Sequence, residues 1–265
     1  MLASAGPRAH IDRMTQLPAL KDPDLEVELT GLAHAYGRAN GPLLRLVNRL
    51  GGRIEAQMRL LPDGIRVEIE RAVTAALTRA HGIAAVGRFA PNLGRRGATF
   101  AAMATGAAGG AAGRVGSLVE LPLTITVMLH AIRAEAEAAG YDPDDPAVRL
   151  TCLTVFAVGS PLRGDDGVNT AFMSARMAVA GGGFQRILAV VVPRLTLILG
   201  EKLALQAVPV IGAVTGAALN AMFLNYYREV ARIRFRLLRL AENHGAEAVL
   251  TGFARAQEKP VLTLR

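Results

Sequence analysis

Four residues place an acid, a base or an amine next to apolar segments, and together they could form a buried polar site: Glu120, His130, Asp165 and Lys202. Lys202 follows Glu201 at a predicted bend between two apolar segments. A charge inside an apolar helix bundle is costly unless it is paired. The two residues could therefore form a structural polar junction with Gln206, or they could mark where the chain meets lipid headgroups.

The other members of this set also have structural explanations. Glu120 and His130 are ten residues apart, close to three helical turns, so one helix would carry them on roughly one side. A single histidine in an apolar helix is also consistent with a structural role. Asp165 and Asp166 precede a predicted helix, where N-capping and the helix dipole account for both. The candidate polar set is Glu120, His130, Asp165, Asp166, Glu201, Lys202 and Gln206.

No established catalytic or metal-binding motif accompanies these residues. The chain lacks the H-E-x-x-H, G-x-S-x-G and G-x-x-x-x-G-K-[ST] patterns. The aspartates of the turn at 142–145 resemble oxygen ligands, but Ala147 and Leu153 occupy the glycine and glutamate positions of an EF-hand loop. The single cysteine, Cys152, excludes an intrachain disulfide. We therefore expect no cofactor and no metal, and the sequence disfavours an enzyme.

The element that must position the polar set is an uncharged stretch, Leu203–Tyr227. Pro209 interrupts it, which predicts a hairpin with one helix ending near Ala207 and another beginning at Pro209. Gly212 and Gly216 form a G-x-x-x-G pair that allows close helix packing. The hairpin could be a buried core or could insert into a membrane. Five arginines follow it and are expected on the water side of a membrane: Arg228, Arg232, Arg234, Arg236 and Arg239.

A second uncharged stretch covers residues 97–113 and contains Gly106, Gly110 and Gly113 at spacings of three or four. This small-residue pattern predicts a thin core helix or a partly mobile loop. The alternative is a helix that packs its glycines against Gly212 and Gly216. Glycine lowers helix stability by about 1 kcal/mol per position, so tight packing would be needed to hold such a helix.

Apolar spacing elsewhere predicts an all-α fold, a single multi-helix domain around the central apolar, glycine-containing helical hairpin. Residues 1–23 are expected to be a flexible tail, 24–258 the helical domain and 259–265 a C-terminal tail. The other predicted helices begin near Leu25, Leu43, Ile65, Pro122, Pro146, Gly167, Phe184, Arg228 and Glu247. Asp145 is expected to cap the helix at Pro146, and Gly140 to end the one before it.

Two segments of the chain resemble the signatures of the EcsC family of bacterial proteins. They are EKLALQAVPVIGAVTGAALNAMF and the longer segment from Glu120 to Gly159, about a quarter of the chain together. The family is named for a member encoded beside an ABC transporter. The resemblance therefore implies a membrane transport system as a partner, and it implies no defined biochemical activity.

The net charge of the chain indicates which other classes of partner to expect. The net charge is +8, carried almost entirely by arginine, because the chain has only three lysines. Such a protein is attracted to anionic membrane lipid, whereas the absence of a basic-aromatic platform makes nucleic acid unlikely as a ligand. No signal peptide is expected, which predicts a cytoplasmic protein, peripheral to or inserted in the inner membrane. We expect a non-catalytic membrane-associated protein; the alternative is a soluble enzyme or ligand-binding protein that uses the polar site.

Overall fold

The all-α prediction is confirmed by a computed structural model, which describes residues 23–39, 41, 63–83, 94–111, 113–157, 183–206 and 212–258. Within these residues the chain forms helices and no strand. The helices are α2 (Pro23–Ala39), α5 (Asp63–Ile83), α6 (Gly94–Ala111), α7 (Gly113–Ala138), α8 (Pro146–Thr154), the 3-10 helix η2 (Val155–Ala157), α10 (Phe184–Gln206), α11 (Gly212–His244) and α12 (Ala246–Glu258).

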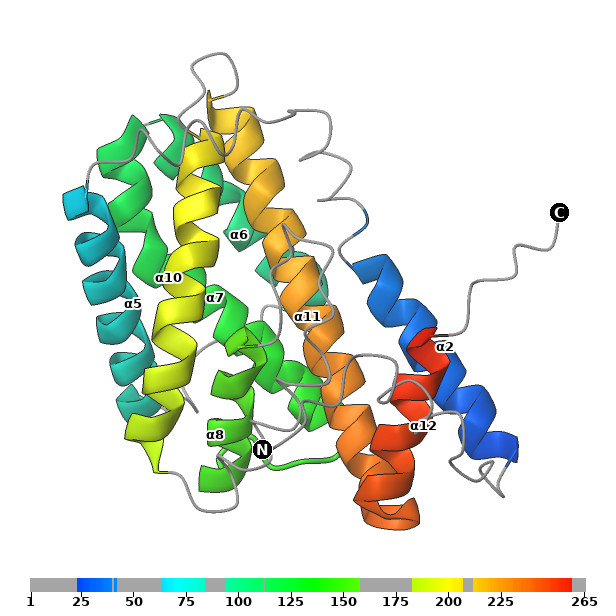
Figure 1. Cartoon of the computed structure of the whole chain (residues 1–265). Helices are drawn as coiled ribbons and strands as arrows, with labels where there is room; N and C mark the ends of the chain where they lie inside the picture. The colour runs from blue at the N-terminus through cyan, green and yellow to red at the C-terminus, as the bar shows by residue number, and fades with distance from the viewer. Residues whose placement is uncertain are drawn as a thin grey trace, which may run out of the picture.

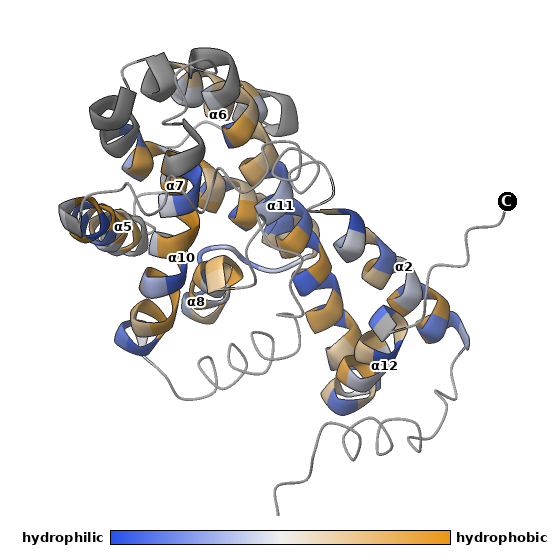
Figure 2. Ribbon diagram, turned by 45° about the horizontal axis from the view of Figure 1, so that its top comes forward, coloured by the Kyte–Doolittle hydropathy of each residue, from blue (hydrophilic) through white to orange (hydrophobic). Residues whose placement is uncertain are grey.

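The long helix α11 organises the molecule and runs through it from top to bottom in Figure 1. Helices α6 and α7 pack against it on one side, and α2 and α12 pack beside its C-terminal half. Helices α5 and α10 lie next to each other, with α10 between α5 and α11 in the view of Figure 1, and α8 contacts both α7 and α10. The apolar residues of these helices turn toward one shared core (Figure 2).

Local signals fix several helix ends as predicted. Asp145 caps α8: its side chain accepts hydrogen bonds from the backbone N–H groups of Ala147 and Val148, and Pro146 occupies the first turn. Gly140 ends α7 with a φ of 84°, a left-handed conformation that suits glycine. The N–H of Tyr141 then donates to the carbonyl of Ala136 at 3.0 Å, which satisfies a carbonyl of the last turn.

Two predicted helix boundaries are wrong. We expected Pro122 to start a helix, but α7 begins at Gly113 and continues through it. Proline costs a backbone hydrogen bond there, and the fully buried Leu121 and Ile125 hold both halves of the helix in the core. We also expected a separate helix from Arg228. It is instead the second half of α11, because no glycine or proline interrupts the chain from 217 to 244.

The uncharged stretch divides between two helices, as the hairpin prediction requires. Its first part ends α10 at Gln206, and its second part begins α11 at Gly212. Leu219, Phe223 and Tyr227 are fully buried, so this arm faces the protein core. No helix among the described residues has the length and apolar content needed to cross a membrane.

Several predictions concern residues outside the described ranges. These are residues 1–22 of the tail expected at 1–23, the tail at 259–265, the helices expected from Leu43 and Gly167, and the predicted helix start at Pro209. Asp165 and Asp166 belong to the same group. Pro23, the last residue of the tail expected at 1–23, instead begins α2.

Candidate functional site

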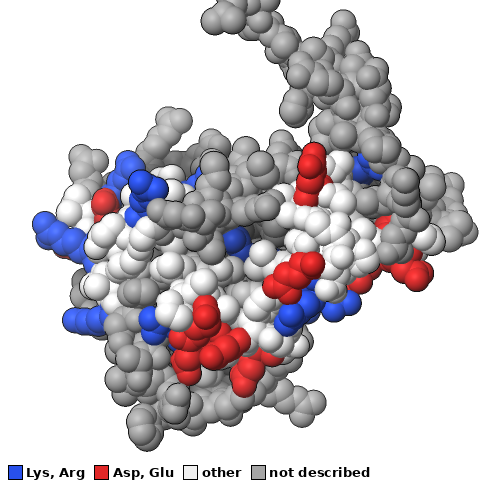
Figure 3. Space-filling view, turned by 90° about the horizontal axis from the view of Figure 1, so that it is seen from below, with Lys and Arg blue, Asp and Glu red and all other residues white. Residues whose placement is uncertain are grey.

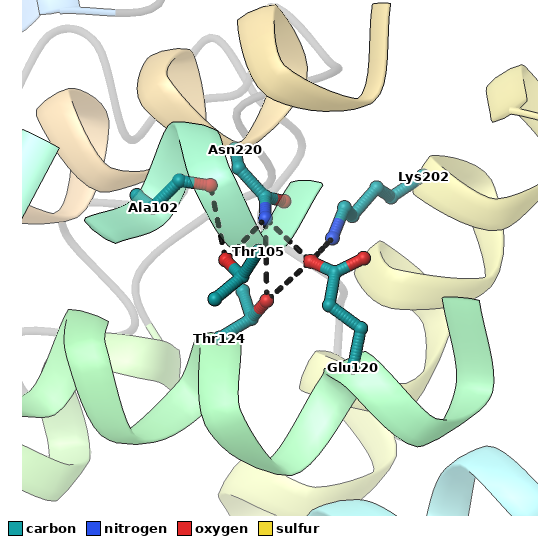
Figure 4. Close-up of polar contacts among 6 residues, drawn as sticks. All are labelled: Ala102, Thr105, Glu120, Thr124, Lys202 and Asn220. Carbon is teal, nitrogen blue, oxygen red and sulfur yellow. Dashed lines mark hydrogen bonds and ion pairs between the residues drawn. The ribbon is translucent and has the colours of Figure 1, made fainter. Parts of the chain in front are cut away.

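A cluster of polar side chains lies inside the apolar core where four helices meet. We call it the polar junction, and it consists of Thr105 from α6, Glu120 and Thr124 from α7, Lys202 from α10 and Asn220 from α11 (Figure 4). Each helix supplies the junction from its buried face. The site therefore exists only when the helices are packed together.

One carboxylate oxygen, Oε1 of Glu120, is the centre of the junction. It accepts hydrogen bonds from the Thr124 hydroxyl at 2.6 Å, from Lys202 Nζ at 3.2 Å and from Asn220 Nδ2. Asn220 Nδ2 also lies 3.2 Å from Thr105 Oγ1 and 3.3 Å from Thr124 Oγ1. The Thr105 hydroxyl in turn donates to the carbonyl of Ala102. A continuous hydrogen-bonded network thus links α6, α7, α10 and α11.

Burial sets the electrostatics of the junction. Lys202 and Asn220 are 0% exposed and Glu120 is 7% exposed. Desolvation lowers the pKa of the Lys202 ammonium, and the carboxylate of Glu120 opposes that shift. A buried ion pair of this kind contributes little net stability, but removal of either partner would leave a charge uncompensated.

The neighbouring acid, Glu201, is also buried, at 6% exposure. The Tyr227 hydroxyl is buried as well and forms no hydrogen bond within the described part of the chain. Its pKa is raised by burial first and then by the charge of Glu201. Glu201 therefore acts on Tyr227 through its charge, whereas the adjacent Lys202 pairs with Glu120.

The structure brings together only part of the predicted polar set. Glu120 and Lys202 are paired, but Lys202 lies within the continuous helix α10 and not at a bend. His130 is partly exposed and shares no hydrogen bond with the junction, because ten residues of helix separate it from Glu120 by about 15 Å along the axis. The side chain of Gln206 lies outside the described part of the structure.

Three members of the junction were not predicted: Thr105, Thr124 and Asn220. Signals for them were present in the sequence. Asn220 is a polar residue within an otherwise apolar stretch, and Thr124 follows Glu120 by four residues, so both face the same way on one helix.

The glycine contact between α6 and α11 agrees with the sharper of the two sequence interpretations. The stretch at 97–113 is helical up to Ala111, and Gly106 lies against the backbone of Gly216. A Cβ atom on Gly106 would be 2.6 Å from the Gly216 carbonyl carbon and 2.8 Å from Asn220 Nδ2. Gly113 belongs to α7 and not to α6. The surroundings of Gly110, Gly113 and Gly212 lie outside the described part of the structure.

The prediction that five arginines form a water-facing basic surface is wrong for two of them. Arg228 is 5% exposed and Arg234 is 4% exposed, because the apolar stripe of α11 continues past Tyr227 and carries both positions into the core. Desolvation lowers the pKa of Arg234 to about 10. Arg228 Nε lies 4.0 Å from a carboxylate oxygen of Glu135.

The other three arginines each pair with an acid. Arg232 pairs with Glu229 and Arg239 with Glu242 on α11 itself, and Arg236 pairs with Glu28 on α2. Figure 3 views the molecule from below, where acidic and basic side chains lie among one another. The C-terminal half of α11 therefore presents no uninterrupted basic stripe.

The chemistry open to the junction is binding or proton exchange at Lys202 and Glu120. No group of three metal-ligating side chains occurs among the described residues. A cation at Glu120 would also be repelled by the Lys202 ammonium at 3.2 Å.

A model of the EcsC protein family matches residues 91–240, which is more than half of the chain. The match contains α6, α7, α8, α10 and most of α11, and hence every residue of the polar junction. Helices α2, α5 and α12 lie outside it. No curated protein and no solved structure matches the chain.

Proposed function

This chain belongs to the EcsC protein family, and we propose that it is a non-catalytic helical protein that associates with anionic membranes through the outward face of α6. One observation carries the proposal. Phe100 is 74% exposed and Met103 is 43% exposed, on a helix with no charged residue from 97 to 111. A helix that is apolar on every side requires an apolar environment on every side.

The core provides that environment for only one face of α6. Ala102 is buried, Thr105 bonds to Asn220, and Gly106 contacts α11. Phe100 and Met103 are three residues apart and so share the other face. The exposed part of a phenylalanine ring is roughly 100–150 Å², and its removal from water is worth about 3 kcal/mol.

Lipid fits this face better than water does. The net charge of +8 favours approach to an anionic surface, where each basic group near the lipid gains about 1 kcal/mol. Such attachment would also bring the protein beside a membrane transport system, the partner class that the family resemblance implies. The arginines of α11 are poorer candidates for this contact, since those at its surface are paired with acids.

Vesicle flotation tests the proposal. We expect the wild-type protein to float with vesicles that contain phosphatidylglycerol at low salt, and a Phe100→Glu/Met103→Glu variant to stay in the dense fraction. Val27→Glu is the matched control, because Val27 is 73% exposed on α2, away from α6, and this variant should float like the wild type. Circular dichroism checks that each variant is folded.

Two results would contradict the proposal. If the folded wild type does not float with anionic vesicles, membrane association is wrong. If the α6 variant floats as well as the Val27→Glu control, association occurs through another surface.

A further inference from the structure

The polar junction contains hydrogen-bonding groups that have no partner among the described residues. Three donors crowd onto Oε1 of Glu120, whereas Oε2 of the same carboxylate is buried and accepts no hydrogen bond. Asn220 Oδ1 is likewise buried, with no donor in the described part of the chain. Lys202 has three N–H bonds and a single acceptor among the described residues, Glu120. Two acceptors and two donor bonds thus remain open within the polar junction.

The charges of the junction decide which ligands suit it. An anion would be attracted by Lys202 but repelled by Glu120. A cation would be attracted by Glu120 but repelled by Lys202. Because the two charges compensate each other at 3.2 Å, an uncharged ligand meets no net repulsion. It must, however, satisfy the open hydrogen bonds, since unmet buried polar groups are costly.

The number of open donors and acceptors narrows the class of uncharged ligand further. The open carboxylate oxygen and amide oxygen require two donors, and Lys202 requires at least one acceptor. A hydroxyl group offers only one donor, and water, which offers two, is the competing occupant that the test below distinguishes. A primary carboxamide offers two donors on its nitrogen and an acceptor on its oxygen, which matches all three groups.

We propose that the polar junction is a binding site for a small molecule bearing a primary carboxamide, with its NH2 group on Glu120 and Asn220 and its oxygen on Lys202. This inference goes beyond membrane association and does not depend on it. It gives a ligand class to the ligand-binding alternative considered from the sequence. Thr105 and Asn220 join α6 to α11 at the same place, so a bound ligand would also stabilise α6 against the core.

The lysine content of the chain makes a direct test possible. Lys21, Lys202 and Lys259 are its only lysines, so protein labelled with ¹³C and ¹⁵N in lysine gives three side-chain sets of NMR signals. We expect acetamide to shift the Lys202 signals to saturation and to leave Lys21 and Lys259 in place. N,N-dimethylacetamide has the same carbonyl but no N–H donor, and it should not saturate the site.

Two variants locate the site on the junction. Glu120→Gln replaces the open carboxylate by an uncharged amide and should weaken acetamide binding more than about tenfold. His130→Gln on the same helix is the matched control and should leave the affinity unchanged, because His130 lies outside the junction.

The comparison of the two amides in the wild-type protein decides the inference even if Glu120→Gln does not fold. The inference is overturned if acetamide produces no saturable shift at Lys202, as expected for a junction that holds only water. An equal response to N,N-dimethylacetamide, or equal binding by a folded Glu120→Gln variant, overturns it as well.

Discussion

Substitution of Gly106 by alanine should destabilise the protein, although alanine is the better helix former. The new Cβ would lie 2.6 Å from the carbonyl carbon of Gly216 and 2.8 Å from Asn220 Nδ2, where ordinary contacts lie at 3.4–4 Å. Backbone cannot rotate away, so α6 and α11 must separate. We take the upper end of the overpacking range, about 3 kcal/mol, offset by about 1 kcal/mol of helix propensity. The net loss is about 2 kcal/mol.

A matched glycine gives the opposite sign. Gly31 lies inside α2, is exposed and has no atom within 4 Å of an added Cβ, so Gly31→Ala should stabilise the protein by about 1 kcal/mol. Urea unfolding followed by circular dichroism measures both changes, provided that the slope of the transition is unchanged. For a chain of this size, the Gly106→Ala variant should also melt about 4–8 °C lower than the wild type.

The relative sign of the two changes is the decisive result. If Gly106→Ala and Gly31→Ala both stabilise the protein, the close contact between α6 and α11 does not exist in solution. The position of Thr105 beside Asn220 would then have no support either.

Two further predictions concern the contact between α11 and α7 and the buried thiol of α8. Arg239 donates to the carbonyls of Ala139 and Gly140 at the end of α7 and lies over the Tyr141 ring, so Arg239→Ala should lower the free energy of unfolding by about 1–2 kcal/mol in a denaturation curve. Arg239→Lys should recover only part of the lost free energy of unfolding, because lysine lacks the planar guanidinium group that donates to both carbonyls. Full recovery would refute this account of the Arg239 contacts. Burial raises the pKa of the Cys152 thiol from about 9 to about 12. The protonated form is favoured in the folded state, so stability should be complete below pH 9 and fall as the pH rises toward 12; a Cys152→Ala variant with the same fall would contradict this.

Much of the helical framework follows from local signals in the sequence. The cap at Asp145 and the left-handed glycine at Gly140 depend on a few adjacent residues, so their sequence patterns predict them directly. The continuity of α7 through Pro122 could not be predicted in this way. It depends on Leu121 and Ile125 being buried against other helices, and this packing outweighs the local cost of proline.

The polar junction was only half predictable for a related reason. The need to pair a buried Lys202 follows from its apolar neighbours, and Glu120 was a candidate. The choice of Asn220 and Thr105 as further partners depends on which faces of α6 and α11 meet. That is set by the contact of Gly106 with Gly216. The glycine spacing predicted a contact of this kind as one of two interpretations, but it did not specify which glycines meet.

The two uncharged stretches show why apolar content alone cannot distinguish a core helix from a lipid-facing one. Both lack charge, and both contain glycines that allow close helix contact. In the arm that begins α11, large side chains such as Phe223 and Leu224 are turned fully into the core, so these side chains offer no surface to a membrane. In α6, small residues make the core contact and the large residue Phe100 points outward. The side of the helix on which its largest side chains lie, relative to its glycines, is therefore what assigns membrane contact to α6 in our proposal.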